Sequence, residues 1–328
     1  MRDRNARDCR CSYVVVVEKG GQPDELRGLA NYLSGLGVDG CDVVVLDLSP
    51  RPQFESNGRI LRWVGRHVAV RPEHCTPMGL LDRVGAAAGV AACDKVIVAS
   101  EDVRYAADAI GRICNLLDAH EVVEPQDYLE PLPWWGSIEA GRILLHRGIE
   151  PQPDHGATFG FRRGAVRTMR NLGGSNAADD PVRRLAAAGA EVFAAADVFV
   201  RREPGTLDEW LGQRPRFAND DFSLPLKSAF FFSILPLLLL LAATGGLRLA
   251  GVYAGVIAFS SVGLALNGRT GAGAFFPIRS CFFAPLWVFE RSVSVYWALL
   301  RKLRGTEADT SRIVLPERAK GTKVASGG

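Results

Sequence analysis

The chain has 328 residues, of which 48% are hydrophobic and 23% are charged, and its mean hydropathy is +0.06. These values exclude a disordered, collagen-like or disulfide-stapled protein. The net charge is only +3, which does not indicate a strongly basic nucleic-acid-binding surface. Two 20-residue stretches, residues 228–247 and 249–268, carry no charge. The sequence therefore predicts a polar globular part followed by a membrane part.

The N-terminal residues and the cysteines bear on the cellular compartment. Residues 1–11 are charged and lack the apolar core of a signal peptide, so we expect a disordered leader. The seven cysteines are scattered and form no Cys-x-x-Cys pair. This pattern predicts reduced thiols on the cytosolic side rather than a metal clip.

Short apolar runs alternate with helical patterns in the first hundred residues. Residues 12–18, 43–47 and 95–102 are rich in valine or isoleucine and predict buried strands. Residues 23–36 and 80–92 predict helices from the spacing or content of their apolar side chains. Such alternation predicts an α/β domain with a mostly parallel, Rossmann-like sheet and flanking helices.

Two of the predicted strands end on polar and acidic side chains. Asp47 closes the second strand, and Ser100, Glu101 and Asp102 close the third. In open α/β sheets, ligands bind at the carboxyl ends of the strands. We therefore expect these residues to lie where a substrate binds.

The middle of the chain is less regular. Residues 124–135 contain three prolines and two adjacent tryptophans, which predicts a loop. The remaining expected elements are a helix over 138–145, a strand over 157–161, a helix over 181–188, a strand over 191–201 and an amphipathic helix over 206–216.

The C-terminal third contains three apolar regions. Each charge-free stretch would form a helix about 30 Å long, the thickness of a bilayer core. We therefore expect membrane spans over about 228–247 and 249–268, the alternative being buried helices of a soluble protein. The third region, about residues 275–300, includes charged side chains that are costly at bilayer depth, and it predicts an interfacial or broken helix.

Basic residues predict the orientation in the membrane. Lys227 and Arg269 flank the open ends of the hairpin, and residues 301–328 contain seven basic against three acidic side chains. Because positive residues favour the cytoplasmic side, we expect a multi-pass plasma-membrane protein with a cytoplasmic globular domain. The expected regions are a leader over 1–11, a globular domain over 12–222, a membrane region over 223–304 and a basic disordered tail over 305–328.

The order of the candidate functional residues is more specific than any single motif. In chain order they are Asp47, then Ser100, Glu101 and Asp102, then Trp134 and Trp135, then Asp179 and Asp180, and finally Gln213-x-x-Arg216-Phe217 before the membrane part. This order resembles family 2 glycosyltransferases, most closely the membrane-bound ceramide-glucosyltransferase-like and bacterial polysaccharide or glycolipid branch with a Gln-x-x-Arg-Trp motif. The resemblance covers about residues 12–305. It implies a GT-A fold, a nucleotide-diphosphate sugar donor, a divalent metal (Mg²⁺ or Mn²⁺) and inversion at the anomeric carbon.

The resemblance also implies roles in donor binding. Asp102 matches the second acid of the family's Asp-x-Asp motif and would bind the metal, which a departing diphosphate needs. Ser100 stands where the first acid would be, which leaves open whether Glu101 compensates. Asp47 would contact the nucleotide base or ribose, although a helix-capping role is the alternative.

Four further residues take roles at the diphosphate and the acceptor. Gln213 and Arg216 match the family motif that lies over the diphosphate, where a guanidinium suits bidentate phosphate contact. The alternative for Arg216 is an ordinary basic residue beside the membrane. Trp134 and Trp135 would stack on a sugar or line the entrance for a lipid acceptor, and core packing or an interfacial anchor explains them equally well.

The general base is the hardest assignment. Inverting transfer needs a carboxylate that takes the proton of the acceptor hydroxyl. The family's acid pair falls in register on Ala177 and Ala178, two residues before Asp179 and Asp180. Our hypothesis takes Asp179 as the base and Asp180 as the helix cap, with the reverse assignment as the alternative.

The favoured function is therefore a membrane-anchored, inverting, hexosyltransferase-type enzyme. It would move a sugar from a nucleotide-diphosphate donor to a lipid-linked or polysaccharide acceptor at the cytoplasmic membrane face. A non-catalytic, GT-A-shaped membrane binding or scaffold protein is the rival, and a polyprenyl-phosphate sugar synthase is a second enzymatic alternative.

Overall fold

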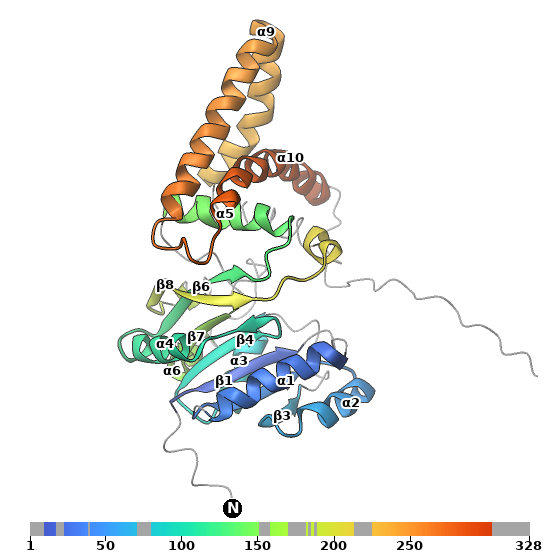
Figure 1. The fold of residues 1–328 in the computed structure, drawn as a ribbon, viewed down its shortest axis with the longest axis vertical. Helices are drawn as coiled ribbons and strands as arrows, with labels where there is room; N and C mark the ends of the chain where they lie inside the picture. Colours follow the sequence, from blue (N-terminus) through green and yellow to red (C-terminus); the bar gives the residue numbers. More distant parts are fainter. Residues whose placement is uncertain are drawn as a thin grey trace, which may run out of the picture.

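The computed structural model describes residues 10–17, 23–38, 40–70, 80–150, 158–169, 182, 185–186, 189–212 and 225–303. The predicted helix over 181–188 therefore lies mostly outside the described residues, as does the tail after 303. Figure 1 shows a sheet with flanking helices at the N-terminal end and a group of apolar helices at the other. The α/β prediction is confirmed.

The first half of the sheet is parallel. Strands β1 (Ser12–Val17), β2 (Asp42–Asp47), β3 (Arg66–Ala69) and β4 (Lys95–Ser100) pair in the order β3-β2-β1-β4. The valine runs of β1 and β2 are buried on both faces, because helices cover the sheet on each side. Both Leu46 and Ser100 pair with Val16 of β1, so β2 and β4 end at the same edge.

The second half of the sheet is mixed. Strand β7 (Thr158–Arg162) is antiparallel to β4 and to β6 (Val122–Leu129), and β8 (Val192–Arg202) is parallel to β6. The two-residue strand β5 (Val103–Arg104) is antiparallel to β8 and closes the eight-stranded order. Through β5, the turn that follows β4 is fixed to the end of β8.

Alternate side chains of β1 enter two hydrophobic cores, one on each face of the sheet. Tyr13 and Val15 belong to the core that contains residues of α1 and α4, and Val14 and Val16 belong to the core beneath α3 and α6. The helices of this part are α1 (Pro23–Val38), α2 (Arg51–Leu61), α3 (Leu80–Val90), α4 (Ala107–Ala119) and α6 (Arg163–Met169).

Two sequence-based expectations need correction. Residues 124–129 were expected in a loop but belong to β6, where the register shifts between Pro125 and Gln126. Proline has no backbone N–H, and the irregularity lets the strand continue past it. Among the described cysteines, Cys93 is in a disulfide, contrary to the expectation of reduced thiols. The others are thiols: Cys11, Cys41, Cys114 and Cys281.

The long apolar helix α9 (Pro225–Gly268) reverses direction at Gly246. This glycine has φ 73° and ψ 175°, which no helix contains. Phe231 and Ala265, one on each side of it, share one buried cluster, although 34 residues of straight helix would separate them by roughly 50 Å. The two arms are visible in Figure 1, and residues 228–268 are long and apolar enough to cross a membrane.

The third apolar region is a broken helix, as expected. A 3₁₀ segment, η2 (Ile278–Phe283), leads into α10 (Ala284–Leu303). Arg291 of α10 is only 2% exposed and lies over the ring of Trp287 at 5.4 Å, so this charge faces the protein interior. The opposite side of η2 and α10 exposes large apolar side chains: Ile278, Phe282, Leu286, Val293, Trp297 and Leu300.

Helix α5 (Gly136–Ile149) joins the sheet to the apolar helices. A methyl group on Gly148 would lie 1.9 Å from the carbonyl oxygen of Leu264, and one on Gly268 would lie 1.9 Å from that of Leu144. The backbones of α5 and α9 are therefore in direct contact. Figure 1 shows α5 between the β6–β8 side of the sheet and the hairpin.

Candidate active site

The predicted metal ligand Asp102 lies at the carboxyl edge of the sheet. Its Oδ1 accepts a hydrogen bond from the Ser100 hydroxyl at 2.5 Å, and its Oδ2 accepts one from Nε of Arg202 at 2.9 Å. The side chain is 31% exposed. Ser100 therefore contacts the carboxylate of Asp102, and Asp102 remains open to solvent on one side.

Backbone pairing brings Asp102 and Arg202 together across 100 residues of chain. Val103 of β5 pairs with Arg202 of β8, and the N–H of Glu203 donates to the carbonyl oxygen of Asp102 at 2.8 Å. Arg104 stabilises this contact between the turn after β4 and the end of β8. Its guanidinium donates to the Glu203 carboxylate at 2.9 Å and to the carbonyl oxygen of Glu101 at 2.6 Å.

Arg202 also contacts a second carboxylate, that of Asp127 at the end of β6. Nη1 of Arg202 donates to Oδ2 of Asp127 at 3.3 Å, and Asp127 is only 6% exposed. Burial raises the pKa of Asp127 above its usual value, against the lowering effect of Arg202 and Arg142. Burial would lower the pKa of Arg202, but the carboxylates of Asp102 and Asp127 raise it above its usual value.

The side chains around Asp102 fit a divalent cation only in part. Within the described ranges, no three His, Cys, Asp or Glu side chains are grouped so that they could hold a metal. A single, partly exposed carboxylate such as that of Asp102 does fit a cation that takes its other ligands from substrate phosphates and water. In this structure, the cation that pairs with Asp102 is the Arg202 guanidinium.

Asp47 lies at the same edge but is fully buried. Its carboxylate accepts hydrogen bonds from the Ser49 N–H at 2.8 Å, from Asn57 Nδ2 at 2.9 Å and from His67 Nε2 at 2.9 Å. Burial would raise the pKa of Asp47, but these hydrogen bonds outweigh it and lower the pKa to about 2. Phe54 of α2 stacks on the His67 ring at 4.2 Å. Asp47 therefore organises the turn between β2 and α2, and its contact with a nucleotide stays a prediction.

The two predicted acceptor tryptophans have different surroundings. Trp134 is 69% exposed, whereas Trp135 is 7% exposed and packs against Trp210 with ring centroids 5.5 Å apart. The other predicted site residues lie outside the described part of the chain: Asp179, Asp180, Gln213 and Arg216.

The site borders the helix that carries the apolar region. Glu139 and Arg142 of α5 are hydrogen-bonded to each other at 2.9 Å, and both act electrostatically on Asp127. The same helix contacts α9 through Gly148. Helix α5 therefore connects the carboxyl edge with the apolar helices.

Sequence reasoning missed Asp127 and Arg202. Asp127 was hidden because its strand was expected to be a loop. Arg202 ends a correctly predicted strand directly before Glu203, but one arginine in an Arg-Arg pair carries no signal of its own. A search for polar residues at the end of every strand, and not only of the valine-rich strands, would have indicated both Asp127 and Arg202.

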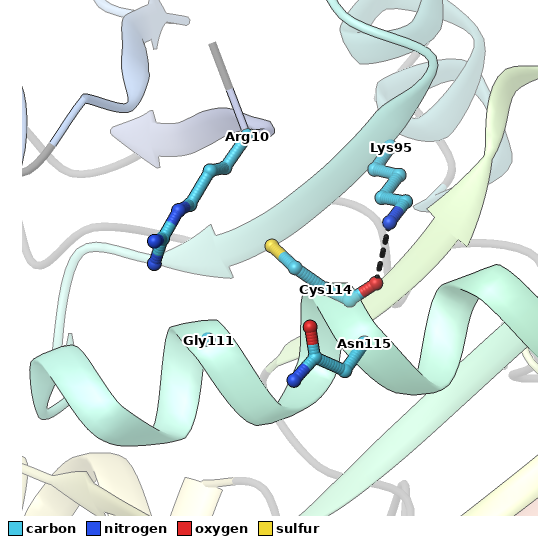
Figure 2. A pocket seen from close by; sticks show the side chains of 5 residues that line it. All are labelled: Arg10, Lys95, Gly111, Cys114 and Asn115. Carbon is cyan, nitrogen blue, oxygen red and sulfur yellow. Dashed lines mark hydrogen bonds between the residues drawn. The ribbon is translucent and has the colours of Figure 1, made fainter.

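A small cavity lies at the opposite end of β4. It has a volume of about 280 Å³ and is lined by Arg10, Lys95, Gly111, Cys114 and Asn115. Figure 2 shows Lys95 at the start of β4 donating to the carbonyl oxygen of Cys114, at 2.7 Å. This cavity is separate from the carboxyl edge that bears Asp102.

No family model matches the chain, and no curated protein matches its sequence. Solved structures with a similar fold include the mannosyltransferase PcManGT from Pyrobaculum calidifontis in complex with GDP-Man and Mn²⁺, at a TM-score of 0.48 and 15% identity over 88% of each chain. They also include glucosyl-3-phosphoglycerate synthase from Mycobacterium tuberculosis with Mn²⁺, UDP-glucose and phosphoglyceric acid. That match has a TM-score of 0.42 and 13% identity over 63% of this chain and 78% of the other.

Proposed function

We propose that this protein is a glycosyltransferase that uses a nucleotide-diphosphate sugar bound at the carboxyl edge of its sheet. The observation that carries the proposal is the position of Asp102. This half-buried carboxylate follows β4, is hydrogen-bonded by Ser100 and lies beside the guanidinium of Arg202. A diphosphate leaving group needs such a site, where positive charge can be held against it.

The donor would be held by residues from several strand ends. Asp102 would hold Mg²⁺ or Mn²⁺, which when bound stabilises the charge of the departing diphosphate. Gln213 and Arg216 would contact the diphosphate, and the β2–α2 turn organised by Asp47 would contact the nucleoside. Ser100 keeps the Asp102 carboxylate oriented, which reduces the reorganisation needed when the donor binds.

The acceptor would be activated by the acid pair that precedes the residue 181–188 segment. Asp179 would take the proton of the acceptor hydroxyl as that oxygen attacks the anomeric carbon, and Asp180 would cap the helix. Attack opposite the leaving diphosphate inverts the anomeric centre. These assignments rest on the family resemblance, which also favours a hexosyl donor.

The acceptor itself would be lipid-linked or a polysaccharide, delivered at the cytoplasmic face of the plasma membrane. The apolar hairpin, its contact with α5 and the exposed apolar side of α10 support a membrane location. Trp134, which is exposed next to α5, would contact an acceptor that arrives along this helix. A polyprenyl phosphate is one acceptor of this kind.

One observation favours the rival function of a non-catalytic scaffold. The Arg202 guanidinium already satisfies the Asp102 carboxylate, as a purely structural ion pair would. The rival predicts that neither metal nor nucleotide binds at this edge.

The decisive experiment uses the full chain in detergent. Its thermal unfolding is followed with a panel of UDP- and GDP-sugars and Mn²⁺, with the free sugars and nucleoside monophosphates as matched controls. Labelled nucleotide sugars that stabilise the protein are then incubated with membrane lipids, and transfer into the lipid or polymer fraction is measured. Stabilisation by one nucleotide sugar followed by transfer supports the proposal. A folded protein that neither binds nor turns over any donor would contradict the proposal and support the non-catalytic scaffold function.

A further inference from the structure

The charges at the carboxyl edge have an arrangement that the expected donor site does not require. Arg202 uses Nε for Asp102, at 2.9 Å, and Nη1 for Asp127, at 3.3 Å. One guanidinium is therefore the shared counterion of two carboxylates from different strand ends.

The two carboxylates are unequal partners. The Asp127 side chain is 8% exposed and lies on the buried side of Arg202, whereas the Asp102 side chain is 31% exposed. Removing a cation from a buried carboxylate is costly, because the carboxylate cannot be rehydrated there. The bond to Asp102 is the one that a ligand from solvent can replace, while Asp127 keeps Arg202 near the site.

We propose, building on the donor site proposed above, that Arg202 is a counterion latch that makes metal and nucleotide binding depend on each other. In the ligand-free protein, Arg202 neutralises Asp102 and disfavours a divalent cation there by like-charge repulsion. When a nucleoside diphosphate binds, its phosphates attract the guanidinium, whose fork geometry suits bidentate phosphate contact. Asp102 then exchanges Arg202 for the divalent cation, and Asp127 retains the arginine at the edge.

This exchange differs from a structural role for Arg202 in the sign of one effect. If Arg202 only connects β8 to the turn after β4, its loss weakens the binding of both metal and nucleotide. If it is a latch, its loss strengthens metal binding in the absence of nucleotide and weakens nucleotide binding in the absence of metal. Coupling between two ligands is reciprocal, so in a variant without Arg202 the nucleotide should also have little effect on the affinity for metal.

The test measures Mn²⁺ binding to the full chain in detergent by the electron paramagnetic resonance signal of the free ion. Binding is measured alone and with UDP or GDP as the nucleotide probe, and Mn²⁺ bound by the nucleotide in protein-free samples is subtracted. For the wild type, we expect about tenfold tighter Mn²⁺ binding with nucleotide. For Arg202→Met, we expect nucleotide-free Mn²⁺ binding about tenfold tighter than wild type, and weaker nucleotide binding in EDTA.

Three further variants assign the effect. The double variant Arg202→Met with Asp127→Asn is used if Arg202→Met alone fails to fold, because it also removes the buried carboxylate that would lack its cation. It should show the same gain in Mn²⁺ affinity. Asp102→Asn with Arg202→Met should abolish that gain. Arg201→Met is the charge-matched control. Arg201 is paired with Glu203 at 3.7 Å. Because successive side chains of a strand point to opposite faces, Arg201 faces away from the side of β8 that carries Arg202.

The outcomes separate the latch from the proposed function. If the wild type binds nucleotide and Mn²⁺ but the folded Arg202 variants leave nucleotide-free Mn²⁺ affinity unchanged or lower, the latch is wrong and the donor site stands. An equal gain in Arg201→Met would also overturn it, since net charge alone would then explain the result. A folded wild type that binds neither ligand overturns both proposals.

Discussion

Asp47 and Asp102 stand at the same edge of one sheet, at the ends of strands that flank β1, yet their surroundings differ in kind. Asp47 is fully buried, and its carboxylate accepts hydrogen bonds from three donors, the Ser49 N–H, Asn57 of α2 and His67 of β3. Asp102 is 31% exposed, and its partners are the Ser100 hydroxyl and one long cationic side chain, that of Arg202. The comparison shows that position at a strand end selects both aspartates, whereas exposure and the partner's charge distinguish a structural acid from one that can take a ligand.

The largest effect should come from Asp102→Asn. We expect transfer to fall by about 100-fold, because the charge that holds the metal at the diphosphate is lost, while the melting temperature changes little. Transfer is measured at matched protein levels, with Asp118→Asn as the control. Asp118 is paired with Lys95 at the opposite end of β4, so its variant should keep wild-type activity. Near wild-type turnover in Asp102→Asn would contradict the assignment.

Asp47→Ala should show the opposite pattern. Its removal takes away the acceptor of His67 Nε2 and the closer of the two acceptors of the buried Asn57 Nδ2, so we expect about 2–3 kcal/mol loss in the free energy of unfolding. Chemical denaturation of the full chain measures this loss, and activity per folded molecule should fall less than in Asp102→Asn. An unchanged midpoint together with lost donor binding would make Asp47 a ligand-binding residue instead.

The pH dependence of stability sharpens the same contrast. The pKa of Asp47 is lowered from 3.8 to about 2, so its ionised form stabilises the fold above the unfolded pKa, and this contribution disappears as the pH falls through the folded value. It amounts to roughly 2 kcal/mol at neutral pH. The difference in unfolding free energy between wild type and Asp47→Asn should be constant from about pH 5 to 7 and shrink below about pH 4. A difference that grows on acidification would contradict the shift.

The smallest effect should come from Ser100→Ala. The lost hydroxyl leaves one Asp102 oxygen without its 2.5 Å hydrogen bond, but the Asp102 side chain is 31% exposed, so water can replace the hydroxyl. We expect about a fivefold decrease in transfer, corresponding to about 1 kcal/mol, and no measurable change in melting temperature. The assay is the same transfer measurement, and a loss as large as that of Asp102→Asn would indicate a direct role for Ser100 in ligand binding.

The fold was predictable where burial dictates composition. The valine runs of β1 and β2 are buried on both faces, and such strands need apolar side chains at every position. Helix α2 was missed because only Asn57 and Leu61 of its side chains are buried, so it has almost no apolar stripe to recognise. Pro125 concealed β6, because a proline in a strand interior normally argues against a strand.

The positions of the candidate site residues were predictable only one residue at a time. Asp102 follows a strong strand signal, and its place at the carboxyl edge follows from the sheet topology. Its pairing with Arg202 depends on the two-residue strand β5, which is too short to leave a periodic pattern. The ion pair with Asp127 depends in turn on which strands become neighbours, and that order is a property of the whole sheet.

The backbone contact between α5 and the hairpin sets a fixed distance in the molecule. Gly148 leaves no space for a side chain against Leu264, and the carbonyl oxygen of Gly148 accepts a hydrogen bond from Asn267 at 3.2 Å. The close packing and this hydrogen bond therefore oppose sliding of the hairpin along α5. If the apolar hairpin lies in a bilayer, as proposed above, this contact would set the height of the Asp102 edge above the membrane surface, and acceptors would be selected by how far their reactive hydroxyl stands above that surface.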